Sequence, residues 1–244
     1  MAEATGPAPR FRSSEAAEQV ATRELVAAMR ETLRSSDDAR LAIPGGSALE
    51  AVVGLRAELA RDWARVKLTW VDERCVDRAD AESNRGRAQR LGLLTAVEGG
   101  SDRPAPRGVL PLYEDGETPA AAVARVEAGL ASDFEGALDV VLLGMGEDGH
   151  VASLFPSRPM PTEGWVAHVN DSPKPPTNRI TLTRACLATA RFVVLLAMGE
   201  GKREALERLE AGDPRLPAYG LGGLVVVTDL ELGHTLRSKQ GERK

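Results

Sequence analysis

Five short apolar runs, each followed by a turn and most of them by a helical pattern, constrain the fold of this chain more than any other feature. They are rich in Val, Leu and Ile and lie at residues 41–43, 66–71, 138–143, 192–197 and 224–228. Continuous runs of this kind are typical of strands that are buried on both faces of a parallel sheet. The alternation predicts an α/β fold with a single doubly wound, mostly parallel sheet and helices on both faces.

The segments between the runs are rich in Ala, Leu, Glu and Arg, which favour helices. We expect helices at residues 15–33, 49–63, 83–94, 119–130 and 202–209. Two stretches look irregular, residues 99–118 and residues 156–178, and long loops in compact domains often shape a binding site. The expected organisation is a flexible tail (1–14), a single α/β domain (15–237) that would hold any functional site, and a C-terminal tail (238–244).

Composition and charge exclude several classes of protein. A chain of 244 residues that is 43% hydrophobic buries a core without needing a disulfide or a metal. A net charge of −5 argues against nucleic acid as a partner, although it leaves room for a small anionic ligand. No apolar run has the length of a membrane span, and residues 1–14 lack the apolar stretch of a signal peptide. We therefore expect a cytoplasmic protein with no membrane partner and with Cys75 and Cys186 reduced, and a monomer as the default state.

Two of the predicted strands are followed by residues suited to binding an anion. In open parallel sheets, ligands bind at the carboxyl ends of the strands. Gly45, Gly46 and Ser47 follow the first run, where glycines admit close backbone approach and a helix N-terminus favours negative charge. Lys202 follows the fourth run, where its ammonium is a further candidate for contacting an anion. The structural alternatives are an ordinary strand–helix turn and a surface lysine at a helix start.

Two other strand ends carry charged groups that are candidates for ligand binding or catalysis. Arg74 follows the second run beside Asp72, either as a cation held by acidic neighbours for a ligand or in a solvated ion pair. Asp148 and His150 lie in the glycine-rich turn after the third run. Histidine is the side chain best suited to proton transfer near neutral pH, so we favour a functional role over a structural one.

Familiar motifs for other ligands do not fit. The spacing of Gly144, Gly146 and Gly149 matches a dinucleotide-binding loop, but Glu147 and Asp148 would face the pyrophosphate. The Gly-Lys pair after the fourth run lacks the remaining residues of a phosphate-binding Walker loop. The three histidines lie far apart in the sequence, and we predict no metal site.

Taken together, these motifs resemble the 6-phosphogluconolactonases, which belong to a larger group that includes the glucosamine-6-phosphate deaminases. The resemblance spans residues 15–236, nearly the whole chain. It is carried by a GGS turn, WVDER with a following SN, GxGK and above all the block GMGEDGHVASLFP. It implies a Rossmann-like fold of the sugar-phosphate isomerase type, hydrolysis of 6-phospho-D-glucono-1,5-lactone in the oxidative pentose phosphate pathway, and no organic cofactor.

Two positions refine this resemblance. In the deaminases a Glu typically stands five residues after the His and assists ring opening, whereas this chain has Phe155, which favours the lactonase. The glycine turn of the lactonases commonly continues with Thr-Pro, but here Ala48 and Leu49 follow Ser47, so one hydroxyl donor is absent.

The resemblance implies roles for the site residues, which we state as a hypothesis. His150 takes a proton from the attacking water, Asp148 orients the imidazole or the turn, and Arg74 contacts the oxyanion or the substrate, or only pairs with Asp72. Gly45, Gly46, Ser47 and Lys202 bind the phosphate, with Arg179 as a second basic candidate. Asp72 is assigned to substrate binding, and Asn84 binds a sugar hydroxyl or fixes its loop. A deaminase and a non-catalytic sugar-phosphate sensor are the competing interpretations.

Overall fold

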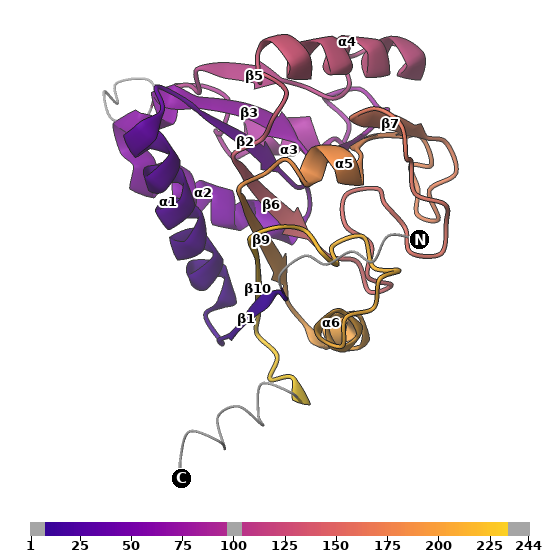
Figure 1. Cartoon of the computed structure of the whole chain (residues 1–244). Coiled ribbons are helices and arrows are strands. Elements are labelled where there is room, and N and C mark those ends of the chain that lie inside the picture. Colours follow the sequence, from indigo (N-terminus) through magenta and orange to yellow (C-terminus); the bar gives the residue numbers. More distant parts are fainter. Residues whose placement is uncertain (1–7, 97–103, 234–244) are drawn as a thin grey trace.

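The computed structural model describes residues 8–96 and 104–233, and a parallel sheet of seven strands runs through its centre (Figure 1). The strand order is β1-β10-β9-β6-β2-β3-β5, and every neighbouring pair is parallel. The strands are β1 (Arg10–Ser13), β2 (Ala39–Ile43), β3 (Val66–Trp70), β5 (Gly108–Leu110), β6 (Val140–Gly144), β9 (Phe192–Ala197) and β10 (Leu224–Thr228). The predicted fold class is confirmed.

A second, smaller sheet is antiparallel and has the strand order β4-β8-β7. Its strands are β4 (Asp72–Arg74), β7 (Val166–Val169) and β8 (Arg179–Leu182). Since β4 begins two residues after β3 ends, the small sheet continues directly from the carboxyl end of a central strand. This connection sets Asp72 and Arg74 on the wall of the site described below.

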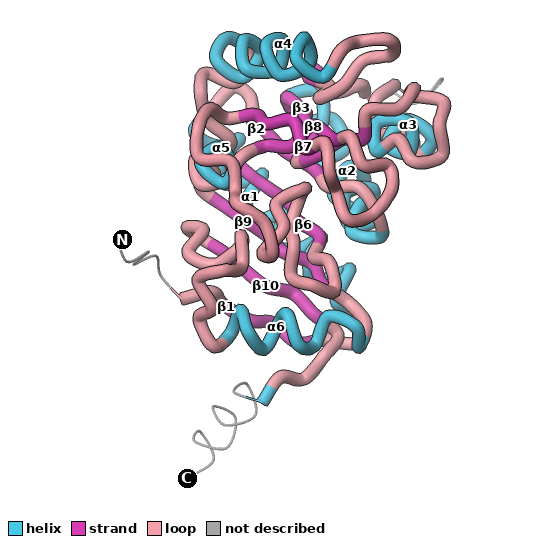
Figure 2. Tube along the Cα trace, turned by 90° about the vertical axis from the view of Figure 1, so that its right-hand side faces the viewer, coloured by secondary structure: helices cyan, strands magenta, loops and turns pink. Residues whose placement is uncertain are grey.

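Helices cover both faces of the central sheet. Figure 1 shows α1 (Ala17–Ser35) and α2 (Glu50–Leu59) on one face, and α5 (Arg184–Leu187), α6 (Arg203–Glu210) and the small sheet on the other. The remaining helices are α3 (Asn84–Arg90), α4 (Pro119–Ser132) and the 3₁₀ turns η1 (Ser47–Leu49), η2 (Ala60–Arg65) and η3 (Glu200–Lys202). Figure 2 shows α6 beside β1 and β10, at the opposite end of the sheet from α4.

The core follows from the apolar runs. All five residues of β10 are buried, and so are Val140 to Leu143 of β6. On α1 the side chains of Ala21, Leu25 and Met29 repeat every four residues and are fully buried against the sheet. Burial on both faces explains why these strands are continuously apolar.

The structure also contains short strands that no apolar run predicts. Residues 10–13, expected within a flexible tail, form β1 instead, because parallel pairing with β10 satisfies their main-chain groups. In the two stretches expected to be irregular, residues 108–110 form β5 and residues 166–169 form β7. The expected C-terminal tail (238–244) and residues 1–7 lie outside the described residues.

Candidate active site

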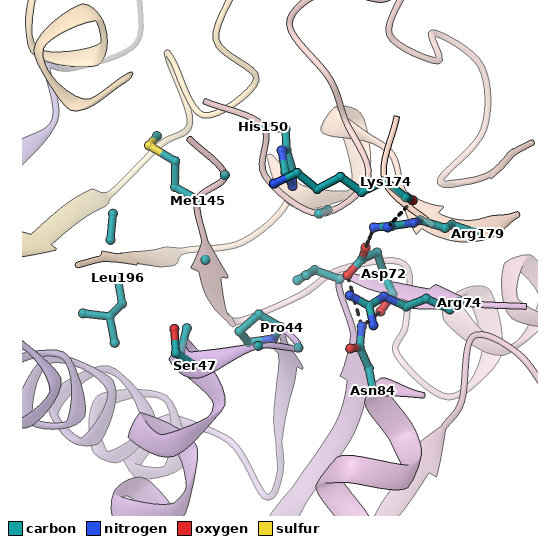
Figure 3. Close-up of a pocket in the computed structure, with 18 of the residues that line it drawn as sticks. Pro44, Ser47, Asp72, Arg74, Asn84, Met145, His150, Lys174, Arg179 and Leu196 are labelled. Carbon is teal, nitrogen blue, oxygen red and sulfur yellow. Dashed lines mark hydrogen bonds and ion pairs between the residues drawn. The ribbon is translucent and has the colours of Figure 1, made fainter. Parts of the chain in front are cut away.

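A cavity of about 390 Å³ opens where the carboxyl ends of β2, β6 and β9 meet the small sheet (Figure 3). Every predicted site residue except Asp148 lines it, and the Asp148 carboxylate contacts the ring of His150. The lining also includes Glu82 and Lys174, which the sequence did not single out. Residues far apart in the chain therefore converge at one edge of the sheet, as the α/β topology predicts.

The glycine turn after β2 forms one end of the cavity. Gly46 has φ +65°, a conformation that favours glycine, and η1 begins at Ser47. A Cβ at position 45 would lie 1.9 Å from Oδ1 of Asn84, so only glycine fits against that side chain. Ser47 is exposed, and its hydroxyl has no hydrogen bond to a described residue. Ala48 adds only a methyl group to the lining, which leaves Ser47 and backbone N–H groups as donors at this end.

Asp72 is held in place by hydrogen bonds from three directions. It is 7% exposed, and its Oδ2 accepts from the Ser153 hydroxyl at 2.7 Å. The Asn84 carboxamide donates to the Asp72 carbonyl oxygen at 2.9 Å and to Oδ1 at 3.3 Å. Arg179 Nη1 lies 3.7 Å from Oδ2. Asn84 is therefore fixed between the glycine turn and Asp72, and it holds these two parts of the cavity wall in contact.

The neighbouring carboxylate of Glu73 anchors α3, a role that the sequence did not reveal. It is 2% exposed and accepts hydrogen bonds from the backbone N–H groups of Arg74, Asn84 and Arg85 at 2.8, 2.8 and 2.6 Å. Burial raises the pKa of Glu73 above its ordinary value, although these three N–H groups act in the opposite direction. Glu73 thereby ties the start of α3, and with it Asn84, to the wall of the cavity.

Arg74 is paired, but its partner is not Asp72. Its Nη1 donates to the main-chain oxygen of Glu82 and lies 3.4 Å from the Glu82 carboxylate. Its Nε is buried without a hydrogen-bond partner in the described part of the chain. Arg74 thus lines the cavity with its Nη1 engaged by Glu82, whose exposed carboxylate lies beside it.

Arg179 is the most enclosed cation of the site, with 5% of its surface exposed. Its Nε donates to the carbonyl of Pro176 at 3.0 Å, and its Nη2 donates to the carbonyl of Lys174 at 2.9 Å. Burial lowers the pKa of Arg179 and the nearby charge of Arg74 adds to this, whereas Asp72 opposes it. The guanidinium joins the proline-rich loop to Asp72.

His150 and Asp148 form a close pair in the turn after β6. The imidazole Nδ1 lies 2.6 Å from Oδ1 of Asp148. Burial acts to raise the pKa of Asp148, but the hydrogen bond from His150 and the charge of the imidazole outweigh it and lower that pKa. Since a carboxylate can only accept, Nδ1 carries the proton of this contact, and in the uncharged form of the ring Nε2 is the basic nitrogen.

Two neighbours shape this pair. A Cβ on Gly146 would lie 2.1 Å from Nδ1 of His150, so the absence of a side chain at position 146 makes room for the contact. The ring of Phe155 packs against the imidazole with 4.8 Å between centroids. Phe155 is buried and supplies no group that exchanges a proton with His150.

The two lysines of the cavity are unpaired, in contrast to its two arginines. Neither Lys174 nor Lys202 forms an ion pair with any residue that the structure describes, and both line the cavity. Lys202 ends η3, which follows β9, whereas Lys174 lies in the loop before β8. The site therefore combines a basic imidazole, two free ammonium groups and a glycine turn, an arrangement suited to an anionic substrate and to proton transfer.

Three further observations on the described residues concern metal sites, membrane-spanning helices and the cysteines. No group of three or more His, Cys, Asp or Glu side chains in residues 8–96 and 104–233 is arranged to hold a metal ion. No helix in that part of the chain is long and apolar enough to cross a membrane. Cys75 and Cys186 are both free.

Comparison with known proteins identifies the family of this chain. A family model described as glucosamine-6-phosphate isomerases/6-phosphogluconolactonase matches residues 12–225. The chain belongs to this family. A 6-phosphogluconolactonase of Streptomyces coelicolor is 37% identical over 87% of this chain and 86% of its own. One of Mycobacterium tuberculosis is 36% identical over 87% of this chain and 90% of its own.

Two solved structures whose names give different reactions share the fold of this chain. A 6-phosphogluconolactonase structure from Thermotoga maritima superposes with a TM-score of 0.76 at 24% identity, over 91% of this chain and 98% of its own. A monomeric glucosamine-6-phosphate deaminase superposes with a TM-score of 0.70 at 20% identity, over 95% and 99%. The fold alone therefore does not distinguish a lactonase from a deaminase, and the comparison has to rest on the site residues.

Proposed function

We propose that this protein hydrolyses 6-phospho-D-glucono-1,5-lactone to 6-phospho-D-gluconate, a step of the oxidative pentose phosphate pathway. The observation that carries the proposal is the Asp148–His150 pair at 2.6 Å, on a cavity that holds two unpaired ammonium groups. The names of the Streptomyces and Mycobacterium relatives support the same activity. A lactone is an activated ester, so a positioned water and a base suffice and no nucleophilic Ser or Cys is required.

The reaction begins with general-base catalysis by His150. Nε2 takes a proton from water as the water oxygen attacks C1, while Asp148 holds the tautomer with the proton on Nδ1. The carbonyl electrons move to its oxygen and give a tetrahedral oxyanion. When this oxyanion collapses, the bond from C1 to the ring oxygen breaks, and the imidazolium returns its proton to that oxygen. The product acid then ionises.

The other residues of the cavity hold the substrate. Gly45, Gly46 and Ser47 offer backbone N–H groups and a hydroxyl to the phosphate, and Lys202 adds a positive charge. Arg74, whose side chain lines the cavity, is a candidate for contacting the oxyanion or a sugar hydroxyl.

Two further residues define the wall against which the sugar lies. Asp72 and Asn84 hydrogen-bond each other there. Both side chains line the cavity, where their remaining polar atoms are suited to sugar hydroxyls.

A coupled assay tests this function against its alternatives. Glucose-6-phosphate dehydrogenase generates the lactone in place, and formation of 6-phosphogluconate is followed after subtraction of spontaneous hydrolysis. We expect the protein to accelerate this step and to release no ammonia from glucosamine 6-phosphate, since Phe155 stands five residues after His150, where the resemblance to the deaminases calls for a Glu. Ammonia release without lactone hydrolysis would identify a deaminase, and binding without either reaction would identify a sensor.

A further inference from the structure

The proline-rich loop before β8 presents a lysine to the cavity, and this lysine has no assigned role. This lysine is Lys174, and its charged side chain lines the same cavity as His150. Figure 3 shows its side chain extending from the loop toward the part of the cavity that His150 occupies. Its ammonium forms no ion pair with a described residue, so its charge is available to a ligand.

The backbone of Lys174 is held firmly although its side chain is free. Its carbonyl oxygen accepts from Arg179 Nη2 at 2.9 Å and from the Ser172 hydroxyl at 3.0 Å. Ser172 is 4% exposed, and its own N–H donates to the carbonyl of Thr177. The loop is therefore closed on itself and fastened to the buried Arg179, which fixes where the lysine side chain starts.

The four cations of the cavity divide into two kinds. The charge of Arg74 is offset by Glu82, and that of Arg179 by Asp72. Lys174 and Lys202 have no such partner in the described residues. Lys202 comes from the central sheet, after β9, whereas Lys174 comes from the loop that leads into the small sheet. The two free charges therefore enter the cavity from different walls.

The substrate of the proposed reaction also carries negative charge at two separate places. Its phosphate is a permanent anion, and the oxygen on C1 becomes anionic when water attacks. With Lys202 at the phosphate, we propose that Lys174 contacts the C1 oxygen and stabilises the oxyanion. Arg179 and Ser172 are then positioning residues, since they act through the carbonyl of Lys174. This inference rests on the proposed function.

Two ligands used as inhibitors distinguish contacts at C1 from contacts at the phosphate. 6-Phosphogluconate has a carboxylate at C1, whereas glucitol 6-phosphate has a neutral CH₂OH there and the same phosphate. We expect Lys174→Met to weaken binding of 6-phosphogluconate about tenfold, the loss of one charge-assisted hydrogen bond, and to leave glucitol 6-phosphate bound as in the wild type. Its kcat should fall about 10- to 100-fold with little change in KM, and Lys174→Arg should restore much of it.

Control variants make the result specific. Lys67→Met removes the same charge on β3, where Lys67 pairs with Asp38 outside the cavity, and should change neither inhibitor constant. Ser172→Ala should reproduce part of the selective loss of 6-phosphogluconate binding, and Ser172→Thr should rescue it. If Ser172 had only a structural role, Ser172→Ala would weaken the binding of both inhibitors alike.

Calorimetric binding keeps this test independent of turnover. If Lys174→Met weakened both inhibitors equally, Lys174 would belong to the phosphate end and the inference would be wrong. An unchanged kcat would overturn it as well. If the wild type hydrolysed no lactone, the proposed function would fail, and the binding difference between the inhibitors would still report where Lys174 acts.

Discussion

Nδ1 of His150 lies 2.6 Å from Oδ1 of Asp148, and this contact determines which ring nitrogen is basic. Asparagine at position 148 has nearly the same shape but offers an N–H as well as an oxygen, so it no longer selects one tautomer. We expect Asp148→Asn to lower kcat about 10- to 100-fold with KM nearly unchanged. Glu147→Gln, which removes the adjacent exposed charge outside the cavity, is the matched control and should retain activity. Equal kcat in the wild type and Asp148→Asn would contradict the assignment.

The space beside this pair gives a second prediction. A Cβ on Gly146 would lie 2.1 Å from Nδ1 of His150 and 2.6 Å from Oδ1 of Asp148, so Gly146→Ala must separate the two side chains. We expect a fall in kcat similar to that of Asp148→Asn, and a double variant no worse than either single one, because both changes break one contact. Gly108→Ala, on β5 with open space around its Cβ, should behave like the wild type in the same assay.

The phosphate assignment of Lys202 is tested by the substrate itself. Lys202→Ala should raise KM for the phosphorylated lactone about tenfold or more, since one charge-assisted contact is lost. KM for glucono-1,5-lactone, which lacks the phosphate, should not change. Steady-state kinetics with both lactones measures this difference, and an equal effect on the two would remove Lys202 from the phosphate site.

Glu73 gives a prediction on stability and pH. Because its pKa is raised in the folded protein, the folded state holds the Glu73 proton more tightly than the unfolded state does. The contribution of Glu73 is therefore most favourable below its ordinary pKa of 4.5 and declines as pH rises through the raised folded value. Relative to Glu73→Gln, the wild type should lose free energy of unfolding over that window.

Denaturant unfolding of both proteins across this window measures the difference. The opposite trend, with the wild type gaining stability relative to Glu73→Gln as pH rises, would mean that the three backbone N–H groups outweigh burial and lower the pKa of Glu73.

The central sheet was predictable because its inner strands are buried on both faces. The runs at residues 192–197 and 224–228 coincide with β9 and β10, where every residue except Thr228 is apolar. The strands that escaped prediction have other requirements. β1 alternates between exposed and half-buried residues at the edge of the sheet, and β4 has only three residues, all charged. Such strands are defined by their partners in space, so their own composition carries little signal.

The site was predictable where one motif supplied both chemistry and position, as in the turn that holds Asp148 and His150. It was not predictable where a residue acts through a distant partner. Glu73 reads as a surface charge until its hydrogen bonds to the start of α3 are seen. Lys174 lies among prolines in a loop, and only the contact of its carbonyl with Arg179 reveals that the loop is fixed beside the cavity.

The most direct test of the account compares wild-type protein with His150→Ala in single-substrate hydrolysis of freshly generated 6-phospho-D-glucono-1,5-lactone. If Nε2 of His150 is the general base, kcat should fall by about 10²- to 10⁴-fold, while 6-phosphogluconate still binds with an affinity close to that of the wild type. Hydrolysis by His150→Ala at the wild-type rate, after correction for the spontaneous reaction, would contradict the central claim.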